Sequence, residues 1–255
     1  MIALQLYKYE ISGSFYSWRG GAWIVAASMI FSLVAYLLLT DKELSLLDQG
    51  EMLFTLTEIV ISLGIIMSVT LASSAISLEI ESGTFESLLL TPLTSKQIAF
   101  QKLLSIITTW FLLYAVSIPY LLVISSGTHL SLSAIFYTGF YGTILVTAFS
   151  SLSIAVSARI RSSKNSIMIS LMILLILLAP SIFFATSLKK TGFGIAIENI
   201  NPVSHTMNSL DSILVDNQQT LSEQEIHIMT VIVFAVVCLL ILLRLSHQFE
   251  VKPIE

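Results

Sequence analysis

Five long stretches of this chain contain no aspartate, glutamate, lysine or arginine: 20–40, 59–78, 103–158, 165–188 and 226–243. An α-helix needs about 20 apolar residues to cross the roughly 30 Å of bilayer hydrocarbon. Four of the stretches fit one crossing each, and the longest fits two. Because the backbone N–H and C=O groups of such a stretch must form hydrogen bonds within the stretch when it lies in lipid, we expect each crossing to be an α-helix. The sequence therefore predicts an all-α integral membrane protein with six transmembrane helices.

The composition supports this prediction over its alternative, a soluble all-α core. Of the 255 residues, 55% are hydrophobic and only 11% are charged, an unusual balance for a soluble domain of this length. The longest stretch contains a polar turn, Ser-Ser-Gly-Thr-His at 125–129, which divides it into two crossings. We expect one transmembrane domain over residues 1–255.

The positions of the basic residues predict the orientation of the spans. With the N-terminus inside, only Lys42, Lys189 and Lys190 fall outside the cell. The other bases then lie on the cytoplasmic side: Lys8, Arg19, Lys96, Lys102, Arg159, Arg161, Lys164, Arg244 and Lys252. The opposite orientation would reverse this ratio. We therefore expect an N-in/C-in, multi-pass protein of the cell membrane, the cytoplasmic or inner membrane in a bacterium.

Two further segments have helical patterns outside the spans. Residues 1–20 place apolar side chains on one helical face, which is typical of an interfacial helix ahead of span one, although a flexible terminus is the alternative. Residues 188–226 are expected to form a short outer helical segment before span six. In it, Asn201-Pro202 reads as an N-cap followed by proline in the first helical turn.

Small residues recur every fourth position in spans two and four. In span four the row includes Thr143, Thr147 and Ser151. Small residues at this spacing let membrane helices pack closely, and a hydroxyl-lined translocation path is the functional alternative. Glu58, near the outer end of span two, is the ionisable residue that best suits such a path, although it could also lie at the headgroup level.

Motifs for catalysis are missing from the sequence. It has no G-x-x-x-x-G-K-[ST] phosphate loop, no G-x-S-x-G elbow and no H-E-x-x-H pair. The one cysteine, Cys238, lies in an apolar stretch and cannot form an internal disulfide. We therefore expect no catalytic site, metal or cofactor in this chain, and an enzyme is the weaker class of function. A protein that moves or holds something is favoured.

The stretch 79–94, between spans two and three, is unusually polar for such an apolar chain. Glu79 and Glu81 extend span two past the bilayer, and Gly83 suits the left-handed position that ends a helix. A short helix should follow from Phe85, after Thr84. Pro92 ends it, and Thr94 with Gln97 forms a capping box that opens span three.

The short helix of this hairpin is amphipathic. Phe85, Leu88 and Leu89 share one face at i, i+3, i+4 spacing, and Glu86 faces away. An apolar ridge held between two sharp corners is the kind of element that docks into a partner's groove. We therefore expect the hairpin to contact a cytoplasmic partner through this ridge.

The residues of the hairpin resemble a known signature. The pattern E-x-E-x-G-T-x-E-x-L-L-x-x-P, followed by an isoleucine and a lysine, is similar to that of the type-2 ATP-binding-cassette (ABC) permeases. The matching residues are Glu79, Glu81, Gly83, Thr84, Glu86, Leu88, Leu89, Pro92, Ile98 and Lys102. Phe85 stands where the family commonly has leucine. The expected six spans and the outer helical segment agree with this family over essentially the whole chain.

The resemblance implies an integral exporter subunit that works with other chains. ATP and Mg²⁺ would be bound by two separate cytoplasmic ATPase subunits, and a second permease copy or a homologous permease would complete the passage. The hairpin would be the coupling helix seated in the ATPase, and Arg159, Arg161 and Lys164 would form a secondary cytoplasmic contact. The alternative is a structural or regulatory membrane subunit that docks a cytoplasmic partner without transport. The sequence does not choose the substrate.

Overall fold

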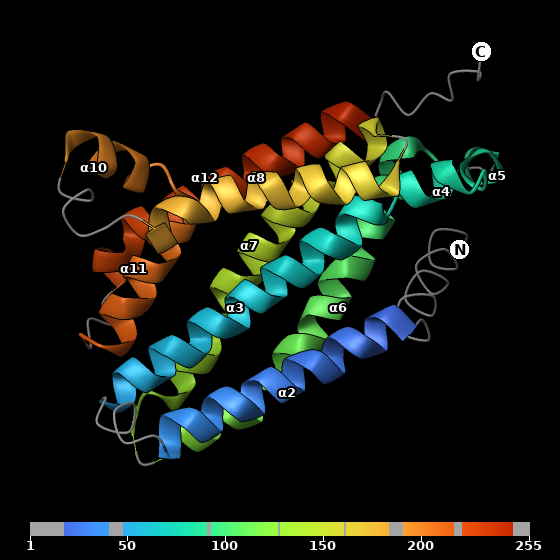
Figure 1. Ribbon diagram of the computed structural model, residues 1–255. Helices are drawn as coiled ribbons and strands as arrows, with labels where there is room; N and C mark the ends of the chain where they lie inside the picture. The colour runs from blue at the N-terminus through green and yellow to red at the C-terminus, as the bar shows by residue number, and fades with distance from the viewer. Residues whose placement is uncertain are drawn as a thin grey trace.

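The computed structural model of this protein describes residues 18–40, 48–90, 93–126, 128–160, 162–183, 191–216 and 221–246. Helices joined by short turns make up nearly all of these ranges (Figure 1). Residues 1–17 lie outside the described ranges, so the predicted interfacial helix stays a prediction, and residues 18–20 belong to the first span.

Within the described ranges, six helices are long and apolar enough to cross a membrane. They are α2 (Trp18–Thr40), α3 (Gln49–Ser74), α6 (Ser95–Ile124), α7 (Ser131–Arg159), α8 (Ser163–Phe183) and α12 (Leu221–Ser246). The all-α class and the six apolar spans predicted from the sequence are therefore confirmed. The second span begins ten residues before the charge-free stretch that predicted it, because α3 includes Glu51 and Glu58.

Helices α3 and α7 form the centre of the bundle. They pack most extensively against each other, and α2, α6, α8 and α12 surround them. The largest fully buried side chains of the core include Trp110, Tyr141, Phe31 and Phe149. In Figure 1, α3 lies in front of α6 and α7, flanked by α2 on one side and α8 on the other. Both flanking helices contact α3.

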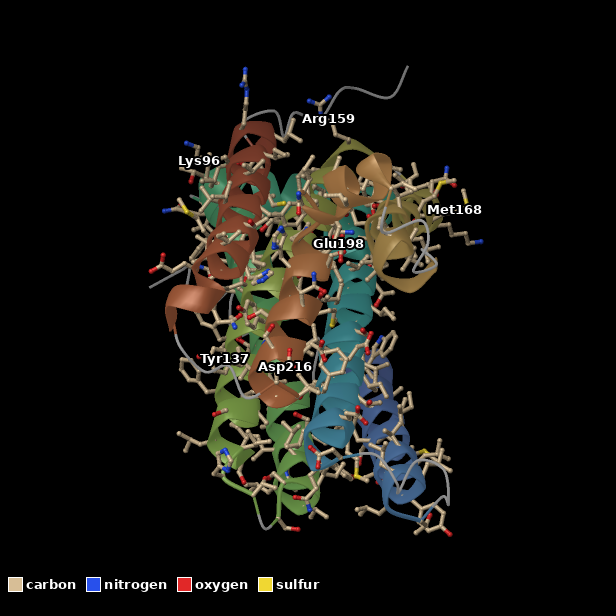
Figure 2. All side chains as sticks on the ribbon, turned by 90° about the vertical axis from the view of Figure 1, so that its left-hand side faces the viewer. Lys96, Tyr137, Arg159, Met168, Glu198 and Asp216 are labelled. Carbon is tan, nitrogen blue, oxygen red and sulfur yellow. The ribbon has the colours of Figure 1, made fainter. Side chains whose placement is uncertain are left out.

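Consecutive long helices run in opposite directions, so the bundle has two distinct ends (Figure 1). One end, the hairpin end, carries the short helices α4 (Ser77–Glu81) and α5 (Phe85–Leu89). The other, the α11 end, carries α10 (Gly192–Glu198) and α11 (Pro202–Leu214). Figure 2 shows Lys96 and Arg159 toward the top of the molecule and Asp216 well below them.

The outer helical segment has the local structure that its sequence predicts. The Asn201 side chain accepts a hydrogen bond of 2.9 Å from the backbone N–H of Val203, and Pro202 occupies the first turn of α11. Val203 and Leu210 are buried against the bundle, and Asp211 is exposed. Helix α11 packs on α12, α3, α7 and α8, so it covers the end of the bundle instead of hanging free as a loop.

Candidate functional site

The connection between α3 and α6 is a compact helical hairpin with well-defined corners. Helix α4 ends in a Schellman motif, in which the Thr84 N–H donates to the Glu79 carbonyl at 3.0 Å and the Gly83 N–H donates to the Ile80 carbonyl at 3.2 Å. Gly83 has a φ of +72°, the left-handed conformation that favours glycine. At the other corner, Thr94 and Gln97 form the predicted capping box of α6. Both corners were predicted from the sequence.

A break separates α4 from α3 at residues 75 and 76. The hydroxyl of Ser157 on α7 accepts hydrogen bonds from the backbone N–H groups of Ile76 at 3.0 Å and Ser77 at 2.9 Å. On the α3 side, the Ser73 carbonyl accepts from the hydroxyls of Ser77 at 3.0 Å and Ser166 at 2.6 Å. Side-chain hydroxyls thus satisfy backbone groups that a continuous helix would pair internally. This hydroxyl cluster (Ser73, Ser77, Ser157 and Ser166) is fully buried.

The two glutamates of the hairpin contact two different spans. The Lys102 ammonium on α6 forms an ion pair of 2.7 Å with the Glu79 carboxylate, and the lysine side chain is only 3% exposed. The Glu81 carboxylate accepts a hydrogen bond of 3.1 Å from the backbone N–H of Ser163, in the first turn of α8. A carboxylate at a helix N-terminus is favourable because that end carries partial positive charge. Helix α4 is thereby connected to α6 and α8 as well as to α7.

The apolar face of α5 points toward the bundle. Phe85 is 5% exposed and packs in a cluster with Ala72, Leu103 and Ile154, and Leu88 packs against the same cluster. The expectation that Phe85 and Leu88 form an outward ridge therefore needs correction, since an amphipathic helix beside a bundle first covers the bundle's own apolar surface. Among the described apolar side chains of the hairpin, Leu90 is exposed by 87% and Leu78 by 43%.

The remaining residues expected at the hairpin end are described only in part. Pro92 and Arg161 lie outside the described residues, as do the side chains of Glu86 and Leu89. Arg159 ends α7 and Lys164 lies in the first turn of α8, and both are exposed near the hairpin.

The hydroxyl row lies on α7, one of the two central helices; Thr143 and Thr147 are half-buried. Thr143, Thr147 and Ser151 donate hydrogen bonds of 2.6–2.7 Å to the carbonyls four residues earlier in the same helix. Thr143 also accepts a bond of 3.0 Å from the indole N–H of Trp110, and Ser151 is fully buried. The sequence left two roles open for this row, close helix packing and a translocation path. These contacts favour close helix packing.

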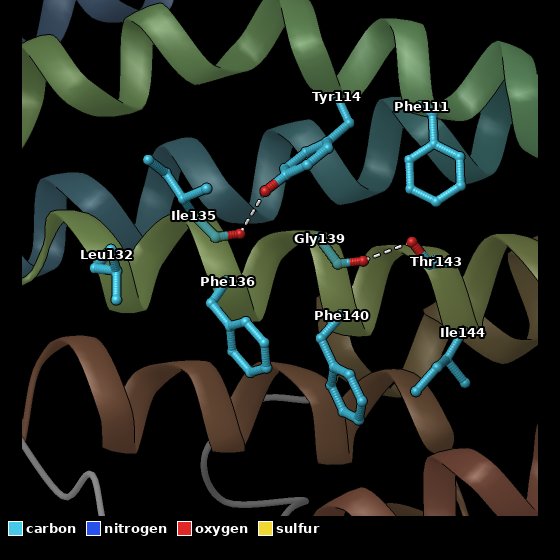
Figure 3. A pocket seen from close by; sticks show the side chains of 9 residues that line it. All are labelled: Phe111, Tyr114, Leu132, Ile135, Phe136, Gly139, Phe140, Thr143 and Ile144. Carbon is cyan, nitrogen blue, oxygen red and sulfur yellow. Dashed lines mark hydrogen bonds between the residues drawn. The ribbon is translucent and has the colours of Figure 1, made fainter.

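Thr143 also lines a pocket of about 650 Å³ that opens between α6 and α7 (Figure 3). Its walls are mainly aromatic and aliphatic, formed by Phe111, Tyr114, Leu132, Ile135, Phe136, Gly139, Phe140, Thr143 and Ile144. The Tyr114 hydroxyl donates to the Ile135 carbonyl at 2.6 Å, and Figure 3 shows this bond beside the one from Thr143 to Gly139. The hydroxyl groups of the pocket wall are thus paired within the protein, and its surface is apolar.

Glu58 lies on a different face from the hydroxyl row. It is half-buried on α3, and Thr55 and Ser62 lie on the same side of that helix, also half-buried. These residues, with Glu51, form one face of helix α3 (Glu51, Thr55, Glu58 and Ser62). Helix α3 itself contacts both α2 and α8. Among the described residues, the Glu58 carboxylate has no hydrogen-bond or ion-pair partner. A carboxylate on a membrane span needs water or a partner, so this face is not suited to bare lipid.

The sequence analysis did not predict the serines that form hydrogen bonds with the backbone at the break between α3 and α4. Ser157 is 80 residues from Ser77 along the chain, and no local pattern indicates that they bond at 3.2 Å. It also missed the buried network of Tyr141, Ser209 and Gln224, in which the Ser209 hydroxyl bonds to both neighbours. Such contacts depend on how α7, α11 and α12 pack.

Comparison with known proteins identifies the family of the chain. A search of curated proteins gave no match. A family model described as "ABC-2 family transporter protein" matches residues 5–248. This match covers nearly the whole chain, including every helix described above. The chain belongs to the ABC-2 family of transporter proteins and is a multi-pass membrane protein.

Proposed function

We propose that this chain is the membrane-spanning permease subunit of an ATP-driven exporter, coupled through the α4–α5 hairpin to separate ATPase subunits that bind ATP and Mg²⁺. The observation that carries this proposal is the connection of the hairpin to three spans. Glu79 bonds to Lys102 of α6, Ser77 bonds to Ser157 of α7, and Glu81 bonds to the start of α8. A force applied to α5 would therefore reach α3, α6, α7 and α8 together.

The charge distribution supports a cytoplasmic position for the hairpin end. All lysines and arginines within the described ranges lie in helix turns at that end: Arg19, Lys96, Lys102, Arg159, Lys164 and Arg244. Acidic residues such as Glu51, Asp211 and Asp216 lie at the α11 end. Basic residues accumulate on the cytoplasmic side of membrane proteins. The ATPase subunits would therefore reach Leu90, and Arg159 with Lys164 would supply the secondary contact.

Phe85 and Leu88 have an internal role in this mechanism. Because Phe85 is buried against α3 and α6, it anchors α5 to the bundle, and Leu90 offers the apolar contact to the partner. ATP-driven closure of the ATPase subunits would move the hairpin and change the tilt of α3 and α6. Such a change drives export only if the substrate binds the two conformations with different affinity.

A second permease copy, or a homologous permease, would cover the α3 face of Glu51, Thr55, Glu58 and Ser62. There Glu58 and Ser62 would line an aqueous passage between the two copies. Thr143, Thr147 and Ser151 of α7, the other predicted path residues, lie away from this face, and their bonds within α7 favour a packing role. A structural subunit that only docks a partner would have no use for a carboxylate at Glu58. This observation favours transport over the non-transporting alternative.

The coupling contact can be tested by placing a carboxylate at Leu90. In Leu90→Asp, the apolar contact is replaced by a charge, and we expect the amount of ATPase that copurifies with the chain to fall about tenfold, equivalent to about 1.4 kcal/mol. Ser126→Asp, which adds a charge to an exposed turn at the opposite end, is the matched control. Equal copurification and ATP hydrolysis for Leu90→Asp and the wild type would contradict the assignment of the hairpin.

The passage can be tested without knowledge of the substrate. Glu58→Cys, in a Cys238→Ser background, should react with a membrane-impermeant maleimide in the assembled complex because water reaches the α3 face. Phe136→Cys, at a side chain that is 61% exposed on α7, should react slowly because it faces lipid. Equal reactivity at both positions would refute the aqueous passage.

A further inference from the structure

Two histidines meet where α11 packs on α12. The Nδ1 atoms of His205 and His227 are 2.8 Å apart, and the ring centroids are 5.0 Å apart. His205 is buried, at 7% exposure, and His227 is half-buried. Neither residue has a role in the coupling mechanism, and both lie at the α11 end, away from the hairpin.

The neighbouring hydrogen bond determines which ring nitrogens carry protons. The Nε2 atom of His205 lies 3.0 Å from the backbone carbonyl oxygen of Asn199, which can only accept. The proton of a neutral His205 is therefore on Nε2, and its Nδ1 atom is an acceptor. His227 must then donate from Nδ1. The neutral pair has one defined arrangement, with His227 as donor and His205 as acceptor.

This arrangement accommodates one additional proton but not two. A first proton binds at Nε2 of His227, and its Nδ1–H still donates to His205, now as a stronger charge-assisted bond. A second proton has only Nδ1 of His205 available, which is the acceptor of the contact. Two imidazolium rings would then place N–H groups and like charges against each other. The contact is therefore kept at neutral pH and lost as the pH falls.

Within the described residues, no carboxylate is bonded directly to either ring to offset this repulsion. The ionisable groups on the elements packed around the pair, at the same end of the bundle, are Glu51 and Glu58 of α3, Tyr141 of α7, Glu198 of α10, Asp211 and Asp216 of α11, and Glu225 of α12. Tyr141 bonds to Ser209, and Glu198 accepts from Asn208. In the part of the chain that the structure describes, no carboxylate is hydrogen-bonded or ion-paired to either ring.

We propose that His205 and His227 form a proton-operated latch between α11 and α12, closed with no or one added proton and opened by the second. The two rings titrate as a coupled pair, so the latch takes up its protons in two steps. Imidazole is the side chain whose charge ordinarily changes between about pH 5 and 8, so acidification in this range is the trigger. Acidification on the α11 side would then break the contact between His205 and His227 and loosen the packing of α11 on α12.

The latch can be tested on the purified full-length chain in nanodiscs, without any ATPase. Spin labels at Ser212→Cys on α11 and Met229→Cys on α12 report the separation of the two helices in a Cys238→Ser background; Met229 is 69% exposed. We expect pulsed electron paramagnetic resonance to give a longer or broader distance distribution at about pH 5 than at about pH 7.5. If the distance distribution between the two spin labels is the same at both pH values with His205 and His227 intact, the proposal is overturned.

Asparagine substitutions test the latch, because an amide does not take up a proton in this pH range and should remove the pH response at either position. In His205→Asn, the amide oxygen still accepts from His227 and cannot be protonated in this range, so the pH response should disappear. In His227→Asn, the amide N–H donates to neutral His205, and the amide can rotate to accept from Nδ1 once His205 is protonated, so this variant should also keep the contact as the pH falls. His129→Asn, at an exposed histidine of the α6–α7 turn, should respond like the wild type. A full pH response in either Asn variant would contradict the latch.

Discussion

The closest packing in the bundle surrounds Trp110, which makes it a sensitive test of the fold. A Cβ atom added to Gly64 of α3 would lie 2.2 Å from Cζ3 of this indole, and one added to Gly142 of α7 would lie 2.3 Å from Cζ2. Since these atoms belong to opposite edges of the same ring, the indole cannot move away from one helix without approaching the other. Its N–H bond to Thr143 further restricts the ring.

Gly64→Ala and Gly142→Ala should therefore both destabilise the protein. Carbon atoms in good contact are about 3.5–4.0 Å apart, so either α3 or α7 must move by more than about 1 Å to accept a methyl group. Overpacking of this kind costs about 1–3 kcal/mol. Trp110→Phe removes the outer ring that both glycines touch, and it should recover part of the stability of either alanine variant.

Unfolding of the purified protein in detergent, followed by circular dichroism, measures these changes. Gly21→Ala is the matched control, because no heavy atom lies within 4 Å of a Cβ atom at that position. We expect Gly21→Ala to be neutral or slightly stabilising, since alanine favours a helix by about 0.5–1 kcal/mol over glycine. If Gly64→Ala and Gly142→Ala were as stable as Gly21→Ala, the close approach of α3, α6 and α7 would be wrong.

Two further predictions concern the hairpin and the α11 end. Ser157→Ala removes the acceptor of two buried backbone N–H groups and should lower the free energy of unfolding by about 1–3 kcal/mol. Ser150→Ala is the control, because the Ser150 hydroxyl is buried with no partner in the described ranges, and its loss should cost little. Equal losses of stability for the two variants in thermal unfolding would refute the role of Ser157. Partial desolvation of the largely exposed carboxylate, together with the nearby Asp216 and Glu51 carboxylates, raises the pKa of Asp211 above its ordinary 3.8. The folded state then holds this proton more tightly than the unfolded state, so ionisation destabilises the fold as pH rises through the raised pKa. Asp211→Asn should raise the melting temperature of the protein near pH 7, and this gain should disappear near pH 4. A gain in melting temperature that does not depend on pH would contradict the raised pKa of Asp211.

Local patterns were enough to predict much of the hairpin. Gly83, Thr94 and Gln97 form the expected corner and cap because helix ends depend on a few consecutive residues. The number of spans followed in the same way from the charge-free stretches. The start of α3 could not be predicted in this way, because Glu58 interrupts the apolar pattern while the helix continues through it.

The parts that could not be predicted depend on contacts between distant segments. Phe85 and Leu88 share one face, as their spacing indicates, but spacing alone does not tell whether that face meets a partner or the bundle. At the break before α4, the hydroxyl of Ser157 on α7 accepts a hydrogen bond from the backbone. The pairing of His205 with His227 joins α11 to α12. Such contacts follow from tertiary packing, which no short pattern contains.

The most direct test of the central claim is a photo-crosslink from the hairpin in the intact complex. A benzophenone amino acid at Leu90, the 87% exposed residue after α5, should crosslink to the ATPase subunit. The same amino acid at Leu132, which is 82% exposed at the opposite end, should give no such adduct. Absence of an ATPase adduct from Leu90 in a complex that still hydrolyses ATP, or an equal adduct from Leu132, would contradict the account.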